Sequence, residues 1–128
     1  MNTKTTAKSV YIAEDSVPVR ARLVEQLTQI PDVVVVGEAA TPADAIAGII
    51  RTRPRYVVLD LQLEGGSGVD VLKAVRRQAV ETVFVVLTNH PQAPFRRICM
   101  DAGADVFLDK STEFNKVTQV ITGAHPKM

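Results

Sequence analysis

Five short apolar runs recur along the chain, and segments with helical patterns separate them. The runs occupy residues 10–13, 33–39, 56–60, 83–88 and 106–109, with the sequences VYIA, VVVVGEA, YVVLD, VFVVLT and VFLD. Their lengths and valine content are typical of strands buried on both faces, as in a parallel sheet. Strand and helix alternate throughout, which favours right-handed crossovers and helices on both faces of one sheet. The pattern predicts an α/β domain with a doubly wound (βα)5 architecture.

Residues typical of helix starts support this order of elements. Pro18 suits the first turn of a helix, and Thr41 followed by Pro42 suits an N-cap and an N1 position. Ser67 and Ser111 are candidate N-caps of two further helices. We therefore expect a helix after each of these positions.

The chain length limits the number of domains. A chain of 128 residues suits a single domain with its own core. Internal repeats, low-complexity segments and linkers are absent from the sequence. We expect one domain over residues 1–128, with a core of about 9–123 and frayed ends at 1–8 and 124–128.

Composition and charge exclude several kinds of partner. Lys and Arg total 15 and Asp and Glu total 14, so the formal net charge of +1 lacks the basic excess that favours direct nucleic-acid binding. The single cysteine, Cys99, excludes an intramolecular disulfide. No apolar run approaches the ~20 residues of a membrane helix, and the first nine residues are polar. We expect a cytoplasmic protein with no membrane or direct nucleic-acid contact.

Polar residues follow the predicted strands where each strand ends. Glu14 and Asp15 follow the first run, Asp60 ends the third, Thr88 ends the fourth and Lys110 follows the fifth. In an open parallel sheet, ligands bind beyond the carboxyl ends of the strands. We therefore expect these five side chains to meet at one edge.

The three carboxylates predict a particular chemistry. Neighbouring carboxylates repel one another, and a hard divalent cation relieves the repulsion. Mg2+ suits such a site because it takes oxygen ligands, including one or two carboxylates and a phosphate oxygen. A carboxylate beside a metal, an ammonium and a hydroxyl is a plausible nucleophile toward phosphorus. We predict that Asp60 is a phosphoacceptor.

Taken together, the residue order resembles the receiver domain of bacterial two-component response regulators, from residue 9 to about 123. The resemblance implies a flavodoxin-like fold with a five-stranded parallel sheet in strand order 2-1-3-4-5. It implies that Asp60 is phosphorylated, with Thr88 and Lys110 as its catalytic partners. It also implies that Asp15, Asp60 and the backbone carbonyl of Gln62 bind Mg2+ directly, while Glu14 acts mainly through water.

The same resemblance implies how a signal leaves the domain. Phosphate oxygens would draw Thr88 inward, and the aromatic side chain of Phe107 would turn into the vacated space. The face formed by the fourth helix, fifth strand and fifth helix would then change. The implied partners are a sensor histidine kinase or histidine phosphotransfer protein and a downstream protein target. The implied assembly is a monomer or a phosphorylation-dependent dimer, and its only catalysis is phosphorylation and dephosphorylation of its own aspartate.

Three departures from the family pattern bear on this site. The segment 63–68, LEGGSG, lacks the Met-Pro pair that often precedes the family's loop glycine, a role that Gly68 would keep. Asn89, followed by His90, replaces the usual small residue after Thr88, which alters access to the acceptor. Ser111 replaces the proline common after the lysine.

Four other functions remain as alternatives. The chain could be the receiver part of a larger DNA-binding transcriptional regulator instead of a stand-alone receiver, or it could act as a phosphorylation-independent interaction module. A phosphatase similar to haloacid dehalogenases needs a second aspartate two residues after the nucleophile, where this chain has Gln62. A flavodoxin-like cofactor carrier would need a phosphate-binding loop after the first strand, where Glu14 and Asp15 would repel phosphate.

Overall fold

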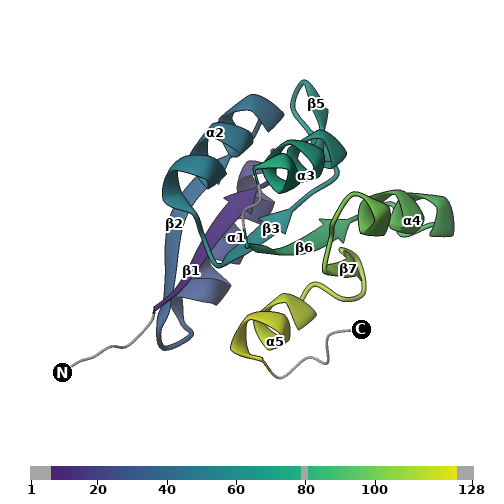
Figure 1. The fold of residues 1–128 in the computed structure, drawn as a ribbon. Coiled ribbons are helices and arrows are strands. Elements are labelled where there is room, and N and C mark those ends of the chain that lie inside the picture. Colours follow the sequence, from purple (N-terminus) through teal and green to yellow (C-terminus); the bar gives the residue numbers. More distant parts are fainter. Residues whose placement is uncertain (1–6, 79–80, 124–128) are drawn as a thin grey trace.

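The computed structural model describes residues 7–78 and 81–123, and its central element is a five-stranded parallel sheet (Figure 1). The strands of this sheet are β1 (Lys8–Ala13), β2 (Val33–Ala39), β3 (Tyr56–Leu59), β6 (Val83–Thr88) and β7 (Val106–Asp109). They lie in the order β2-β1-β3-β6-β7, and every neighbouring pair is parallel. Counted within this sheet alone, the order is the predicted 2-1-3-4-5, so the predicted flavodoxin-like fold is confirmed.

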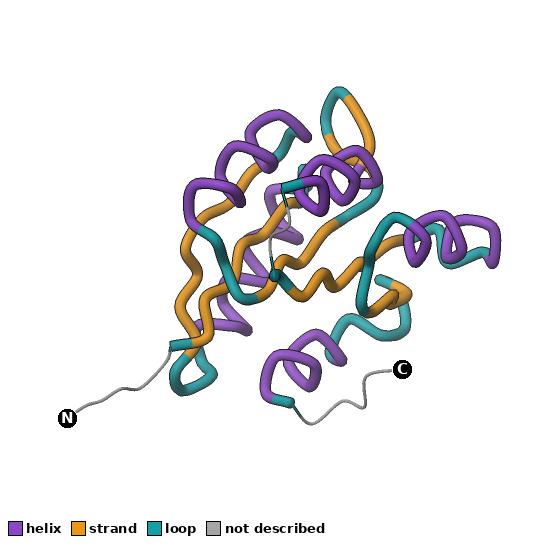
Figure 2. The backbone as a smooth tube through the Cα atoms, in the orientation of Figure 1, coloured by secondary structure: helices purple, strands orange, loops and turns teal. Residues whose placement is uncertain are grey.

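Helices cover both faces of the sheet (Figure 2). They are α1 (Val17–Thr28), α2 (Pro42–Thr52), α3 (Gly68–Arg77), α4 (Ala93–Asp101) and α5 (Lys116–Thr122). Helices α2, α3 and α4 contribute to the core on one face, and α1 and α5 contribute to the core on the other. Among the described residues, no helix combines the length and apolar character needed to cross a membrane.

The core consists of two apolar layers separated by the sheet. Neighbouring strand residues point to opposite faces, so Val58 lies in the layer with α1 and α5 while Leu59 lies in the layer with α2, α3 and α4. The buried helix residues of the first layer are Leu23, Leu27, Val117, Val120 and Ile121, and those of the second are Ala45, Ile49, Val71, Leu72, Val75 and Cys99. Burial on both faces fixes the strand register, which brings the carboxyl ends of the strands to one edge.

Local hydrogen bonds explain where three helices begin. The Ser16 hydroxyl accepts a hydrogen bond from the Val19 amide, and Pro18 occupies the first turn of α1. The Thr41 hydroxyl caps α2, and the Ser67 hydroxyl accepts a hydrogen bond from the Val69 amide at the start of α3. The helix starts predicted from Pro18, Thr41 and Ser67 are therefore confirmed.

Three predictions about local structure are wrong. Ser111 caps no helix, because α5 begins only at Lys116 and Ser111 lies in a turn where its hydroxyl donates to Asp109. Strand β2 is not buried on both faces, because it lies at the edge of the sheet and leaves Val34 48% exposed. Lys8 is not frayed but pairs with Val33 in the sheet. The other predicted frayed ends, residues 1–6 and 124–128, lie outside the described residues.

The glycine-rich segment after β3 contains a hairpin that the apolar pattern does not predict. Strands β4 (Gln62–Leu63) and β5 (Gly66–Ser67) pair in antiparallel fashion. Gly65 has a φ of +80° in the intervening turn, a conformation that favours glycine. The hairpin leads directly into α3 and forms one side of the edge where the polar residues gather.

Candidate functional site

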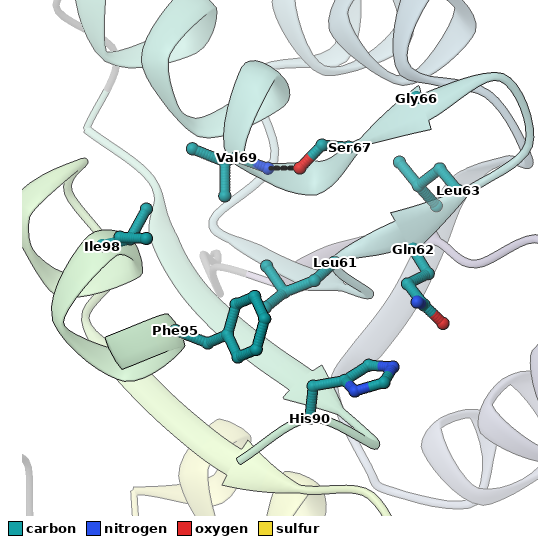
Figure 3. A pocket seen from close by; sticks show the side chains of 9 residues that line it. All are labelled: Leu61, Gln62, Leu63, Gly66, Ser67, Val69, His90, Phe95 and Ile98. Carbon is teal, nitrogen blue, oxygen red and sulfur yellow. Dashed lines mark hydrogen bonds between the residues drawn. The ribbon is translucent and has the colours of Figure 1, made fainter. Parts of the chain in front are cut away.

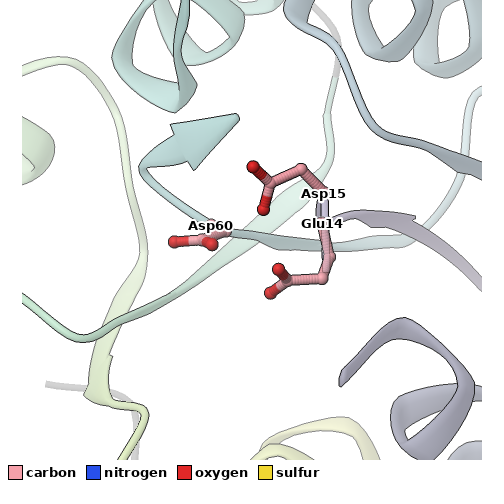
Figure 4. A group of neighbouring side chains, drawn as sticks. All are labelled: Glu14, Asp15 and Asp60. Atoms are coloured by element: carbon pink, nitrogen blue, oxygen red, sulfur yellow. The ribbon is translucent and has the colours of Figure 1, made fainter. Parts of the chain in front are cut away.

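The carboxyl ends of β1 and β3 bring three carboxylates together (Figure 4). Glu14 and Asp15 follow β1, and Asp60 follows β3. One carboxylate oxygen from each residue lies within 4.8 Å of the other two. Glu14 and Asp60 are buried and Asp15 is exposed. The predicted convergence of these three residues is confirmed, and the exposed Asp15 makes the cluster accessible to solvent.

Lys110 links two of these carboxylates from the end of β7. Its Nζ lies 2.9 Å from Glu14 Oε1 and 2.9 Å from Asp60 Oδ2. The side chains of the three residues are only 12%, 3% and 7% exposed, so water screens these ion pairs weakly. A main-chain hydrogen bond holds the backbone of Lys110 in place, because the Lys110 amide donates to the Thr88 carbonyl at 2.7 Å.

Burial and pairing shift the pKa values of this cluster. Burial raises the pKa of Glu14, although hydrogen bonds from Lys110 and from the Ser16 amide oppose that shift. Burial alone would lower the pKa of Lys110, but its hydrogen bonds to Glu14 and Asp60 and the attraction of their negative charges together outweigh burial and raise it. Lys110 therefore remains a cation across the physiological pH range.

The donor set of the cluster fits Mg2+. Three ionised carboxylates and one ammonium would leave a formal charge of minus two, which one divalent cation neutralises. Carboxylate oxygens are ligands that Mg2+ prefers, and the exposed position of Asp15 leaves room for the waters that Mg2+ retains. Gln62 lies beside the site, since its backbone amide donates a 3.3 Å hydrogen bond to Asp60 Oδ1. The ligand role of its backbone carbonyl stays a prediction.

Backbone contacts hold the Asp60 loop in place. The Asp60 amide donates a 2.9 Å hydrogen bond to the Ala13 carbonyl, and the Gly68 amide donates a 2.8 Å hydrogen bond to the Leu61 carbonyl. A Cβ atom at Gly68 would collide with the Asp60 carbonyl oxygen, and a backbone atom cannot move aside as a side chain can. Gly68 therefore allows the start of α3 to approach the backbone of the candidate phosphoacceptor.

Thr88 and Phe107, the predicted switch residues, lie on neighbouring strands. Thr88 is fully buried, and its hydroxyl accepts a 3.0 Å hydrogen bond from the His90 amide. Phe107 is 7% exposed, and the Arg96 guanidinium of α4 lies 5.7 Å from the centre of its ring. Phe107 is thus already buried in this structure, and its movement with Thr88 stays a prediction.

A groove beside Asp60 was not predicted from the sequence (Figure 3). It has a volume of about 490 Å³ and lies between the β4-β5 hairpin and α4. Its apolar lining includes Leu61, directly after Asp60, together with Phe95 and Ile98 of α4. Phe95 is 46% exposed and Ile98 is 48% exposed. No sequence signal distinguished these two side chains from helix residues that face the core.

Comparison with known families gives a match over nearly the whole chain. The model of the family described as the response regulator receiver domain matches residues 10–122. The nitrate/nitrite response regulator protein NarP of Escherichia coli is 36% identical over 105 residues, which cover 81% of this chain and 48% of that protein. A nitrate/nitrite response regulator protein homolog of Haemophilus influenzae is 33% identical over 100 residues, covering 77% of this chain and 48% of that protein. The chain thus spans about half the length of these curated relatives.

Solved structures share the same fold. The signal receiver domain of the putative response regulator NarL from Mycobacterium tuberculosis superposes with a TM-score of 0.84 and 29% identity, covering 94% of this chain and 98% of that one. The response regulator domain of Thermotoga maritima CheB, at 20% identity, superposes with a TM-score of 0.81 over 91% of this chain and 94% of that one. With the match over residues 10–122, these findings show that the chain belongs to the receiver domain family of two-component response regulators.

Proposed function

We propose that this chain is a phosphorylation-dependent signalling switch in which Asp60 accepts the phosphoryl group. The observation that carries the proposal is the position of the Asp60 carboxylate, which lies within 4.8 Å of two other carboxylates and 2.9 Å from the Lys110 ammonium. Phosphoryl transfer depends mainly on positioning and on neutralising charge, and both requirements are met here by named side chains. Membership of the receiver family supports the same function.

The proposed donor is a phosphohistidine on a histidine kinase or histidine phosphotransfer protein. A carboxylate oxygen of Asp60 attacks phosphorus and forms a P–O bond while the P–N bond breaks. The departing imidazole nitrogen keeps the electron pair of the broken bond and takes a proton from water. Mg2+, held by Asp15, Asp60 and the Gln62 carbonyl with Glu14 acting through water, would neutralise negative charge on the transferring group.

Lys110 and Thr88 stabilise the phosphorylated state in this proposal. The Lys110 ammonium already contacts Asp60, so it can follow the phosphoryl oxygens without moving far. The Thr88 hydroxyl accepts its hydrogen bond from His90, which leaves its own proton available to a phosphoryl oxygen. The phosphoryl group remains on the protein's own aspartate, so the chain acts as a switch and not as a turnover enzyme.

The signal leaves through protein contact at the face formed by α4, β7 and α5. Phe107 connects this face to the site, because it lies on β7 opposite Val86 of β6, two residues before Thr88, and beneath Arg96 on α4. The exposed Phe95 and Ile98 of α4 line the neighbouring groove between α4 and the β4-β5 hairpin, where such apolar side chains would favour an additional contact with a protein target. The target would contact a monomer or a phosphorylation-dependent dimer.

A second candidate function concerns the output. One relative, from Bacillus subtilis, is named a transcriptional regulatory protein, and the matched region covers 49% of its length. We propose as the alternative that this receiver controls a DNA-binding domain. The phosphorylation chemistry at Asp60 is the same in both cases, and only the protein surface that responds to the switch differs.

Intact mass spectrometry tests the phosphorylation. The native chain would be incubated with acetyl phosphate, with Mg2+ or with a chelator, beside Asp60→Asn and the control Asp101→Asn, which alters an exposed carboxylate at the end of α4. We expect one phosphoryl adduct in the native chain and in Asp101→Asn, only with Mg2+, and none in Asp60→Asn. An adduct that persists in Asp60→Asn would show that another residue is the acceptor. No adduct despite bound Mg2+ would favour a phosphorylation-independent interaction module.

A further inference from the structure

Arg20, on α1, contacts the backbone that carries the acidic pair. Its Nη1 donates a 2.7 Å hydrogen bond to the carbonyl oxygen of Glu14. Its Nε lies 3.2 Å from Glu38 Oε1, near the end of β2. The Arg20 side chain is 21% exposed, so this guanidinium joins α1, β1 and β2 in a partly buried position.

The Glu14 carbonyl belongs to the peptide unit that joins Glu14 to Asp15. The Glu14 amide on its other side donates a 2.9 Å hydrogen bond to the Ala39 carbonyl, and the Glu14 side chain accepts a 2.9 Å hydrogen bond from the Ser16 amide. Together with these bonds, the hydrogen bond from Arg20 directly restrains the orientation of the peptide that precedes Asp15. Rotation of that peptide would move the Asp15 carboxylate relative to Asp60.

We propose that Arg20, itself oriented by Glu38, is a positioning residue that sets the Mg2+ affinity of the acidic cluster through the backbone of Asp15. The inference rests on the proposed function, because it assumes that Asp15 and Asp60 bind Mg2+. Groups that orient metal ligands without touching the metal commonly change affinity by about 10- to 100-fold when removed. Arg20 would belong to this class, acting through a main-chain carbonyl.

The positive charge of Arg20 allows a loss of positioning to be distinguished from a purely electrostatic effect on Mg2+ binding. A cation near a cation-binding site weakens binding by repulsion, so the loss of Arg20 through charge alone would strengthen Mg2+ binding. The loss of positioning would weaken it. The two explanations therefore predict changes of opposite sign in the dissociation constant for Mg2+.

The experiment is an Mg2+ titration of the unphosphorylated chain, followed by amide chemical shifts in NMR spectra. The variants are Arg20→Met, Arg20→Lys and the control Arg22→Met, which removes the same charge from the same helix at an exposed position. We expect the dissociation constant to rise about tenfold in Arg20→Met. We expect a smaller rise in Arg20→Lys, because one ammonium replaces the planar fork that contacts both Glu14 and Glu38. Arg22→Met should stay within about twofold of the native chain, because solvent and salt screen an exposed charge.

A second readout separates positioning from loss of the fold. Acetyl phosphate labelling of Arg20→Met should need a higher Mg2+ concentration for half-maximal rate, and saturating Mg2+ should restore the native maximal rate. Mg2+ binding by Arg20→Met that is as tight as in the native chain, or tighter, would overturn the inference and leave Asp60 phosphorylation untouched. If Arg20→Met does not fold, Arg20→Lys decides, because native affinity in that charge-conserving variant would also overturn the inference. Failure of the native chain to bind Mg2+ would overturn it together with the proposed metal site.

Discussion

Replacement of Asp60 by asparagine should stabilise the chain when Mg2+ is absent. The change keeps the shape of the side chain and an oxygen that can accept a hydrogen bond from Lys110, but it removes a negative charge that is buried beside two others. The variant therefore tests the electrostatic free energy of placing three carboxylates together at this edge, while the packing of the loop stays the same. We expect Asp60→Asn to unfold at higher urea concentration than the native chain.

The magnitude follows from the distances. At an effective dielectric constant of about 20, the attraction between Lys110 Nζ and Asp60 Oδ2 at 2.9 Å is about 6 kcal/mol. Repulsion between two carboxylate oxygens at 4.8 Å, the upper limit of their separation in the cluster, is about 3.5 kcal/mol for each pair, and the exposure of Asp15 reduces its share. Attraction and repulsion therefore nearly cancel, and the remaining term is desolvation of the Asp60 carboxylate, which costs several kcal/mol in a buried site. We expect a net stabilisation of roughly 1–3 kcal/mol in Asp60→Asn.

Mg2+ should reduce the difference in stability between the two chains. A ligand that binds only the folded state stabilises it by about 1.4 kcal/mol at a concentration ten times its dissociation constant. Asp60→Asn loses one carboxylate ligand, so it should gain less from Mg2+ than the native chain. The difference in the free energy of unfolding between the two proteins should therefore shrink as Mg2+ is added.

The assay is urea unfolding followed by far-ultraviolet circular dichroism, because the chain has no tryptophan to report by fluorescence. Each protein would be measured with a chelator and with increasing Mg2+, and Asp101→Asn would control for the loss of a surface carboxylate. A loss of more than about 1 kcal/mol in Asp60→Asn without Mg2+ would refute the reasoning, since the ion pair with Lys110 would then outweigh repulsion and desolvation. Equal stabilisation of both proteins by Mg2+ would show that Asp60 is not a ligand.

Three further predictions follow from individual contacts. Burial raises the pKa of Glu14, so its carboxyl group binds a proton more tightly in the folded chain than in the unfolded chain. As pH rises above 4.5, the ordinary pKa of this group, the native chain should therefore lose stability relative to Glu14→Gln. Urea unfolding curves measured across this pH range without Mg2+ test the expectation. Burial raises the pKa of the Cys99 thiol to about 11, and the residue is 0% exposed. Labelling of this thiol by a thiol reagent at pH 8 should therefore be at least ~100-fold slower in the folded chain than in the chain unfolded by urea. Rapid labelling of the folded chain would contradict this expectation. Asp105→Ala should lower the free energy of unfolding, measured in urea, by about 2–3 kcal/mol. The reason is that Asp105 Oδ2 accepts a 2.8 Å hydrogen bond from the Phe84 amide and lies 2.8 Å from Arg76 Nη2. Asp105→Asn should lower it less.

Most of the sheet could be predicted because its strands are short valine-rich runs that alternate with helical segments. The runs at 33–39, 83–88 and 106–109 match β2, β6 and β7 at both ends, since valine-rich segments between helices pair in a parallel sheet. The edge position of β2 could not be predicted from its own residues, because a run of four valines looks the same at the edge and in the centre. The hairpin formed by β4 and β5 has strands of two residues, which is too short for a periodic pattern.

The site residues could be predicted where the strand topology determines their position, but not where their position depends on the direction of a side chain on a helix. Asp60 and Lys110 follow strands and Thr88 ends one, and parallel strands bring their carboxyl ends to one edge whatever the details of packing. Arg20 and Phe95 lie on helices, where a residue's neighbours depend on how the helix is rotated against the sheet. The hydrogen bond from Arg20 to the Glu14 carbonyl and the groove beside Phe95 therefore required coordinates.

Two of the three departures from the family pattern are accommodated by contacts close to them. Gly65 lies in the hairpin turn with nothing near its Cβ position, whereas Gly68 lies against the Asp60 carbonyl. The unusual 63–68 segment therefore retains glycine where α3 approaches the backbone of Asp60. Ser111, which replaces the usual proline after Lys110, donates from both its amide and its hydroxyl to Asp109 Oδ1, at 2.9 and 2.7 Å. These bonds lower the pKa of Asp109 and hold the loop that follows the lysine. A serine in this turn restrains the backbone by hydrogen bonding where proline would restrain it by its ring, so we expect Lys110 to remain directed at Asp60 despite the substitution.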